Sequence, residues 1–233
     1  MLTADELVEG IFGGQHLALR AEFAGWVRGS RRFAAFADVY RGKIRAKLRH
    51  ARDEGGLRDV RAELVTAALL LREDRFSLEY EKYAAARTRG PDFTVTFKGH
   101  MPFNVEVRRI RNGELDTADA GARTAKLIAV LVDKASQMPP SIINVLWLSA
   151  EGEIDADDLT HAVATVRQLA ERKDDDYFAR RGYRDAADFL GQYQRLSGIV
   201  RPAAGAPVLW RNPTARHKIP PDLAAALGRL RGP

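Results

Sequence analysis

Apolar residues recur at helical spacing through the first part of the chain. Three runs show this pattern, over residues 2–12, 17–36 and 38–52. We therefore expect an N-terminal helical region over residues 1–56. Gly55 and Gly56 then break the pattern, and they are expected to separate this region from a longer helix over residues 57–72.

The apolar pattern then changes from a helical period to a period of two. Three runs alternate and a fourth is almost wholly apolar, as a buried central strand would be: residues 75–81, 92–97, 103–110 and 141–148. Helical spacing returns over residues 117–138 and 155–172. The order helix, three strands, helix, strand, helix predicts an α/β domain with a mixed sheet over residues 57–172.

The last part of the chain is less regular. Residues 171–193 are rich in charge, and we expect an exposed helix there. Pro and Gly then interrupt the pattern repeatedly, leaving room for short edge strands at 199–200 and 208–210 and a terminal helix at 223–230. We expect residues 173–233 to be an elaboration that packs on the α/β core.

The second and third strand-like runs carry charged residues on one side only. Side chains alternate between the two faces of a strand, so Phe93, Val95 and Phe97 share one face and Asp92 lies on the other. In the third run, Glu106 and Arg108 lie opposite the apolar residues. If the two runs pair as an antiparallel hairpin, the Asp92, Glu106 and Arg108 side chains share one polar face.

A third carboxylate comes from the preceding helix. Glu63 lies three residues after Val60 and four before Ala67, on or beside the apolar stripe of the 57–72 helix. A carboxylate that faces a core or cleft needs a partner, because an isolated buried charge is costly. Glu63 could be a flanking surface residue paired with Lys or Arg, or it could share a site with Asp92 and Glu106.

The composition excludes several classes of protein. An apolar fraction of 45% is ordinary for a folded domain, and no apolar run reaches the about 20 residues that a membrane-spanning helix needs. The chain has no Cys, which excludes disulfides and thiolate zinc sites. The first residues do not resemble a secretory signal, so a cytoplasmic protein without membrane association is the expectation.

The charge favours a polyanionic partner. The net charge is +6, and 29 Arg stand against 8 Lys. Arg binds phosphate through a planar fork, although a GC-rich genome would also raise the Arg content. Basic residues crowd the 38–52 helix, where a phosphate-contacting surface and a plain solvated face both remain open. Our candidate nucleic-acid-binding residues are Arg41, Lys43, Arg45, Lys47 and Arg109.

These residues and their order carry a resemblance to a known superfamily. Glu63 on a helix, Pro91-Asp92 at a strand start and Glu106-Val107-Arg108 in the next strand resemble the motif of the PD-(D/E)XK nuclease-like superfamily. The resemblance covers about residues 57–172. It implies a restriction-endonuclease-like fold, in which a mixed four-stranded sheet is flanked by helices.

The resemblance also implies a metal-dependent nuclease. Asp92 and Glu106 would be the metal ligands for Mg²⁺ or Mn²⁺, with Glu63 as an additional carboxylate. The metal would lower the pKa of a bound water and offset charge on the scissile phosphate. Nucleic acid is the implied substrate, with DNA favoured over RNA. The choice between a monomer and a homodimer stays open.

The chain departs from the motif at Arg108, where the superfamily has Lys. Arg stays protonated at neutral pH and is a poor general base, but it can stabilise charge on a phosphate. The Lys role could have moved to Lys134, at the end of the core stripe of the 117–138 helix, although a cation near a helix C-terminus is also simply favourable there. Gln137 of the same helix, Lys82 and Lys98 are the other candidates.

Two other functions therefore stay open. The domain could be a catalytically inactive module that binds nucleic acid or protein, or a structural α/β protein in which carboxylates merely pair with Arg. The five His residues lack metal-ligand spacing, and no phosphate-binding GxxxxGK[ST] loop occurs. A His-ligated zinc centre and a P-loop NTPase are therefore not expected.

Overall fold

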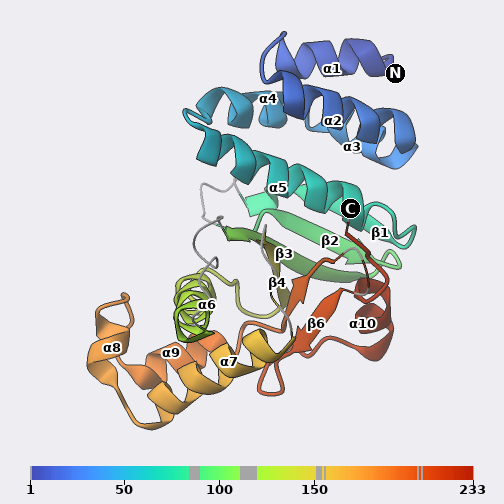
Figure 1. Cartoon of the computed structure of the whole chain (residues 1–233). Coiled ribbons are helices and arrows are strands. Elements are labelled where there is room, and N and C mark those ends of the chain that lie inside the picture. The colour runs from blue at the N-terminus through green and yellow to red at the C-terminus, as the bar shows by residue number, and fades with distance from the viewer. Residues whose placement is uncertain are drawn as a thin grey trace.

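A six-stranded mixed sheet separates two groups of helices (Figure 1). The computed structural model describes residues 2–83, 90–110, 120–150, 154, 156–203, 205 and 207–232. The strands are β1 (Phe76–Tyr80), β2 (Phe93–Phe97), β3 (Met101–Ile110), β4 (Ile143–Ala150), β5 (Gly198–Arg201) and β6 (Val208–Arg211). The helices are α1 (Ala4–Phe12), α2 (Leu17–Gly29), α3 (Arg31–Val39), α4 (Arg41–His50), α5 (Glu54–Leu70), α6 (Ala120–Ala135), α7 (Ala156–Glu171), α8 (Asp175–Ala179), α9 (Ala186–Tyr193) and α10 (Pro221–Leu227).

The strands lie side by side in the order in which they occur along the chain. Strand β2 runs antiparallel to its neighbours β1 and β3, strands β3, β4 and β5 run parallel, and β6 returns antiparallel to β5. The sequence α5–β1–β2–β3–α6–β4 is the predicted order of elements. The predicted four-stranded sheet is wrong, however, because β5 and β6 extend the same sheet beyond β4. Strand β5 lies inside the sheet and only β6 forms that edge.

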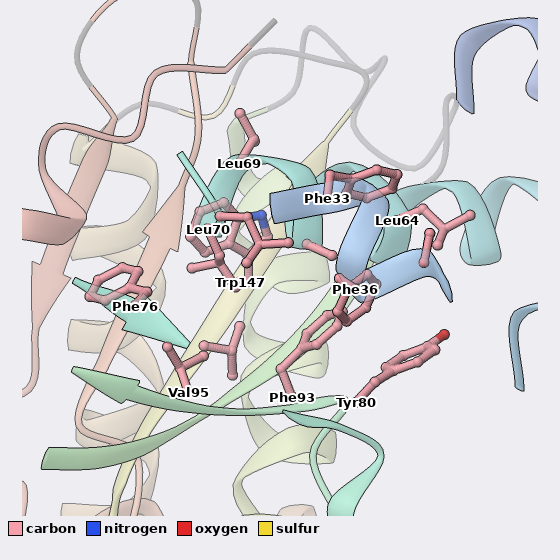
Figure 2. Close-up of a cluster of buried hydrophobic side chains, with 14 of the residues drawn as sticks. Phe33, Phe36, Leu64, Leu69, Leu70, Phe76, Tyr80, Phe93, Val95 and Trp147 are labelled. Carbon is pink, nitrogen blue, oxygen red and sulfur yellow. The ribbon is translucent and has the colours of Figure 1, made fainter. Parts of the chain in front are cut away.

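One face of the sheet packs against the N-terminal helices and α10. Its hydrophobic cluster, here called the first cluster, runs without a break from α1 to the central strands. Aromatic rings hold it together: Tyr80 stacks on Phe93, with ring centroids 5.1 Å apart and planes at 18°. Figure 2 shows side chains of this cluster from α3, α5, β1, β2 and β4, and it labels Phe33, Phe36, Leu64, Leu69, Leu70, Phe76, Tyr80, Phe93, Val95 and Trp147.

The opposite face of the sheet packs against α6, α7 and α9 in a second cluster. Within it, the rings of Phe178 and Phe189 stack with centroids 4.5 Å apart. Both rings are fully buried, and Tyr193 lies beside them. The expectation of one exposed helix over 171–193 is therefore right only in part: the segment forms two short helices, α8 and α9, and most of its charged residues are exposed, but its aromatic residues are buried. The Phe178 side chain of α8 and the Phe189 and Tyr193 side chains of α9 point inward, and the many charges of the segment conceal this apolar face in the sequence.

Helix α5 begins earlier than the sequence suggested. The side chain of Asp53 accepts a hydrogen bond of 2.7 Å from the Gly56 backbone N–H, so Asp53 caps the helix. Gly55 and Gly56 therefore lie inside the first helical turn and do not separate two regions. With Asp53 as its cap, the helix begins at Glu54, whereas the sequence pattern predicted a start at Leu57.

Strands β2 and β3 form the predicted antiparallel hairpin, with the predicted residues on each face. Phe93 pairs with Val105 and Thr94 with Asn104, so the apolar residues share one face and the polar residues the other. The polar face does not meet solvent at its centre. Thr94 Oγ1 donates to Asn104 Oδ1 (3.0 Å), and Asn104 Nδ2 donates to Asn144 Oδ1 of β4 (3.0 Å). All three side chains are buried, so this ladder satisfies polar groups across three strands.

No helix within the described ranges is long and apolar enough to cross a lipid bilayer.

Candidate functional site

Three carboxylates gather where α5 approaches the beginning of β2. Glu63 comes from α5, Glu106 from the middle of β3, and Asp92 from the residue before β2. The Asp92 carboxylate accepts a hydrogen bond of 2.8 Å from the backbone N–H of Val107. This bond ties the start of β2 to the centre of β3, where Asp92 interacts electrostatically with both Glu63 and Glu106. We call Glu63, Asp92 and Glu106 the carboxylate cluster.

Two donors occupy the Glu63 carboxylate. Lys47 of α4 lies 2.5 Å from Glu63 Oε2, and the Tyr80 hydroxyl donates to the same oxygen at 2.5 Å. Lys47 also forms an ion pair of 2.8 Å with Glu81. Burial raises the pKa of Glu63, and the Lys47 charge opposes that shift without cancelling it. Burial alone would lower the pKa of Lys47, but Glu63 and Asp92 outweigh it and raise that pKa.

Asp92 is the most perturbed carboxylate of the cluster. Burial raises its pKa well above the usual range, and the negative charges of Glu63 and then Glu106 raise it further. Lys47 and the Val107 N–H oppose the shift but do not cancel it. The negative charges of Glu63 and Glu106 therefore add to burial in disfavouring the ionised form of Asp92. A bound cation would relieve this repulsion, because it lowers the free-energy cost of keeping Asp92 ionised.

Glu106 is paired by α6 on the other side of the sheet. The ammonium of Lys134 lies 2.7 Å from Glu106 Oε1, and it also donates to Gln137 Oε1 at 3.2 Å. The Lys134 and Glu106 side chains are only 13% and 10% exposed. The helical stripe that buries Leu127, Val130 and Leu131 thus carries Lys134 to the cluster.

Arg108 projects from β3 two residues after Glu106. Its Nε is buried, and no group in the described part of the chain accepts a hydrogen bond from it. A buried N–H without an acceptor costs free energy, so it favours any ligand oxygen that reaches it. Arg108 is therefore available as a donor beside the carboxylate cluster.

The basic helix α4 divides its cations between two faces. Arg41, Arg45 and Arg49 follow one another at intervals of four residues and are exposed. Lys43 and Lys47 face the sheet, where Lys43 donates to the Tyr80 and Glu81 carbonyl oxygens at 2.8 and 3.1 Å. Of these five cations of α4, only Arg41, Arg45 and Arg49 are exposed.

Arg109 is placed differently from the other candidate nucleic-acid-binding residues. Its side chain is 5% exposed and forms an ion pair of 2.7 Å with Asp59 of α5. Its Nη2 also donates to the Gly55 carbonyl oxygen at 3.1 Å. Arg109 thus joins β3 to the first turns of α5, a structural contact that the sequence did not indicate.

A hollow of about 360 Å³ opens beside the cluster, between α4 and α5. Its lining includes Lys43, Lys47, His50, Asp59, Glu63 and Glu81.

The sequence pattern did not identify Tyr80 and Lys47 as the partners of Glu63. A signal was present for Lys47, which directly precedes buried Leu48 on α4 and so lies at the border of that helix's apolar stripe.

The donor set suits a hard divalent cation. Mg²⁺ prefers oxygen ligands and is often held by only one or two protein carboxylates with several waters. Asp92 and Glu106 provide two such carboxylates. Among the described residues, no group of three or more His, Cys, Asp or Glu is arranged to hold a metal ion.

No protein-family model matches this chain, and neither the curated proteins nor the solved structures contain a match to it.

Proposed function

We propose that this protein hydrolyses phosphodiester bonds in nucleic acid with the help of Mg²⁺ or Mn²⁺. One observation carries the proposal: Asp92 is close enough to Glu63 and Glu106 to interact with both charges, and the Lys134 ammonium lies 2.7 Å from Glu106 Oε1. The order α5–β1–β2–β3–α6–β4 supports it, because it is the order implied by the resemblance to PD-(D/E)XK nucleases.

Each residue of the site would have a distinct role. Asp92 and Glu106 would hold the cation, and the bound cation supplies an acidified water and charge neutralisation at the phosphate. Glu63 is kept in place by Lys47 and Tyr80, and it would orient water at the edge of the site. Arg108 would donate its N–H groups to the phosphate oxygens.

Lys134 would take the place of the motif lysine. An ammonium group can direct its three donors at a water or a phosphate oxygen, and lysine can lose its proton and act as a base, which an arginine side chain does not do in proteins. Lys134 lies within hydrogen-bond distance of Glu106, one of the proposed metal ligands. The exposed row of Arg41, Arg45 and Arg49 on α4 would bind the substrate backbone beside the site.

The test is a cleavage assay with the purified protein. Single- and double-stranded DNA and RNA are incubated with Mg²⁺, with Mn²⁺ and with chelator. We expect cleavage that requires the divalent ion, and its loss in Asp92→Asn and Glu106→Gln. Asp176→Asn is the matched control, because it makes the same change on exposed α8 and should leave cleavage unchanged. Full activity in Asp92→Asn would exclude the proposed site.

A second function is favoured by the pairing of the carboxylates. Lys47, the Val107 N–H and Lys134 each already satisfy one member of the cluster. A nuclease-like domain without catalysis could keep this arrangement and only bind nucleic acid. It would show no divalent-ion binding by calorimetry, and its nucleic-acid affinity would fall as salt is raised. Ion-dependent cleavage lost in Asp92→Asn separates the two functions.

A further inference from the structure

A cavity lies where the junction of α2 and α3 meets the carboxyl end of α5. Figure 1 shows α2 and α3 beside α5. The cavity has a volume of about 430 Å³, within the range of roughly 300–1,000 Å³ that is usual for small-molecule sites. Its described lining comes from two stretches of the chain, residues 25–33 and 68–74. We call it the tryptophan cavity, because Trp26 lines it.

The apolar part of the lining is aromatic and well packed. Trp26 makes edge-to-face contacts with Phe23 and Phe33, with ring centroids 6.3 and 5.7 Å apart. Phe33 is fully buried and also lines the cavity, together with the aliphatic side chains of Ala68 and Leu71. The two ring contacts hold the Trp26 side chain in place. A planar ligand can therefore pack on it without the entropic cost of ordering a mobile side chain.

Helix α2 contributes backbone and no side chains at two positions of the lining. Gly25 and Gly29 lie one helical turn apart, and both line the cavity. A Cβ added at either glycine would meet nothing within 4 Å. The two glycines therefore leave room for a ligand beside Trp26, and a large side chain at Gly25 would occupy that room without displacing other parts of the chain.

Arg32 is already engaged by the backbone beside the cavity. Its Nη1 donates to the carbonyl oxygens of Leu71 and Glu73 at 2.6 and 2.8 Å, and its Nη2 donates to the Phe76 carbonyl oxygen. Its Nη1 also lies 3.6 Å from Asp74 Oδ1, and Asp74 is the one acidic residue of the described lining. The charges of Arg32 and Asp74 therefore largely offset each other.

Arg72 brings the remaining charge of the described lining. Its Nη1 donates to the Arg231 carbonyl oxygen at 3.1 Å, and within the described ranges Arg72 forms no ion pair. The indole N–H of Trp26 has no acceptor among the described residues either. A carboxylate accepts two parallel hydrogen bonds from a guanidinium group, so it is a suitable partner for Arg72. The described lining thus offers donors and one positive charge, and it is complementary to a monoanion.

We propose that the tryptophan cavity binds a planar aromatic ligand that carries one carboxylate. The ring of the ligand packs against Trp26 and Phe33, and its carboxylate accepts hydrogen bonds from Arg72. None of the three residues of the carboxylate cluster lines this cavity. The site is therefore separate from the proposed phosphodiester-cleaving site, and it does not depend on that activity.

The test is calorimetric titration of the full chain with three probes: 2-naphthoate, 2-naphthamide and 2-naphthylmethylamine. They share one ring system and carry a negative, no and a positive charge. We expect 2-naphthoate to bind about tenfold or more tightly than the amide, because it alone forms charge-assisted hydrogen bonds with Arg72. The amine should bind no more tightly than the amide. Tightest binding of the amine would assign the cavity to cations through Asp74 and overturn the proposal.

Two substitutions test the two parts of the site. Gly25→Leu should abolish 2-naphthoate binding, because the new side chain fills the cavity. Its control is Gly10→Leu, at an exposed glycine of α1 where an added Cβ also meets nothing within 4 Å. Arg72→Gln should lower the affinity for 2-naphthoate to that for 2-naphthamide. Arg172→Gln changes an exposed arginine outside the described lining and should leave both affinities unchanged.

A second measurement does not depend on how the variants fold. In the nuclear magnetic resonance spectrum of the wild type, 2-naphthoate should shift the indole N–H signal of Trp26 and leave that of Trp210 on β6 in place. Thermal unfolding shows that each variant is folded before its affinity is compared. The proposal is wrong if 2-naphthoate gives no heat, if folded Gly25→Leu binds it as tightly as the wild type, or if the Trp26 signal does not move.

Discussion

The ammonium of Lys47 and the carboxylate of Glu63 lie 2.5 Å apart and join α4 to α5. Their side chains are 23% and 15% exposed, so removing one partner leaves the other charge largely buried. We expect Lys47→Met to lower the free energy of unfolding by about 3 kcal/mol, because an unpaired buried carboxylate is strongly unfavourable. Urea unfolding followed by circular dichroism measures the change.

The double variant Lys47→Met/Glu63→Gln should be more stable than Lys47→Met alone, because it removes the unpaired charge. Arg45→Met makes the matched change on the exposed side of α4 and should stay within about 0.5 kcal/mol of the wild type. If Lys47→Met and Arg45→Met are equally stable, the ion pair contributes nothing to folding.

Asn144 should be among the most sensitive polar residues of the sheet. Its Nδ2 donates to the carbonyl oxygens of Pro139, Ile142 and Arg195 at 2.8, 3.1 and 3.0 Å. Asn144→Ala leaves buried acceptors without donors, and we expect a loss of about 2–3 kcal/mol of stability. Thermal unfolding tests this, with the half-buried Thr96→Ala of β2 as the milder control. Equal melting temperatures for the two variants would contradict the importance of this network.

Glu73 should make stability depend on acid. Hydrogen bonds from Arg75 lower the pKa of Glu73, and a hydrogen bond from Arg229 lowers it further. Burial opposes these effects without cancelling them, and the pKa falls from 4.5 to about 2 in the folded protein. A lowered folded pKa stabilises the protein above the unfolded pKa, and this contribution is lost as the pH falls towards about 2. The stability gap between wild type and Glu73→Gln should therefore shrink over this acid range. Urea unfolding across the range measures the gap, and a gap that is constant with pH would refute the linkage.

Two glycines should respond in opposite directions to the same substitution. Gly25 lies exposed inside α2, and an added Cβ would meet nothing within 4 Å. Gly25→Ala should raise stability by about 0.5–1 kcal/mol, because Ala has the higher helix propensity. Gly13 ends α1 with φ of +55°, so Gly13→Ala should lower stability by about 1 kcal/mol. Thermal unfolding of the pair gives both signs, and stabilisation by Gly13→Ala would contradict this account.

The parts of the fold that follow from short-range patterns could be predicted. Alternation in β2 and β3 gave the correct faces and the pairing of these strands, because one face must be buried and register follows from it. Helical spacing likewise found most of α5 and α6. The shortest elements were harder, since β5 and β6 have four residues each and cannot establish a period. Their place in the sheet is decided by pairing with β4, which is a long-range contact.

The sequence predicted which three carboxylates come together better than it predicted which basic side chains pair with them. Grouping Glu63, Asp92 and Glu106 used only helical and strand periods, and the structure brings them close enough to perturb Asp92. The direction in which a long basic side chain turns depends on tertiary contacts. Lys47 turns inward to Glu63, and Arg109 turns to Asp59, although both are basic residues of a basic chain.

Strand β4 has a consequence for the cooperativity of folding. Val145 and Trp147 belong to the first cluster, while Leu146 and Leu148 belong to the second. Strand β5 repeats the division, with Val200 in the first and Ile199 in the second. Unfolding of either cluster would disturb β4 and β5, which also carry residues of the other cluster. We therefore expect the helices on the two sides of the sheet to melt in one transition, with β4 as the thermodynamic link between them.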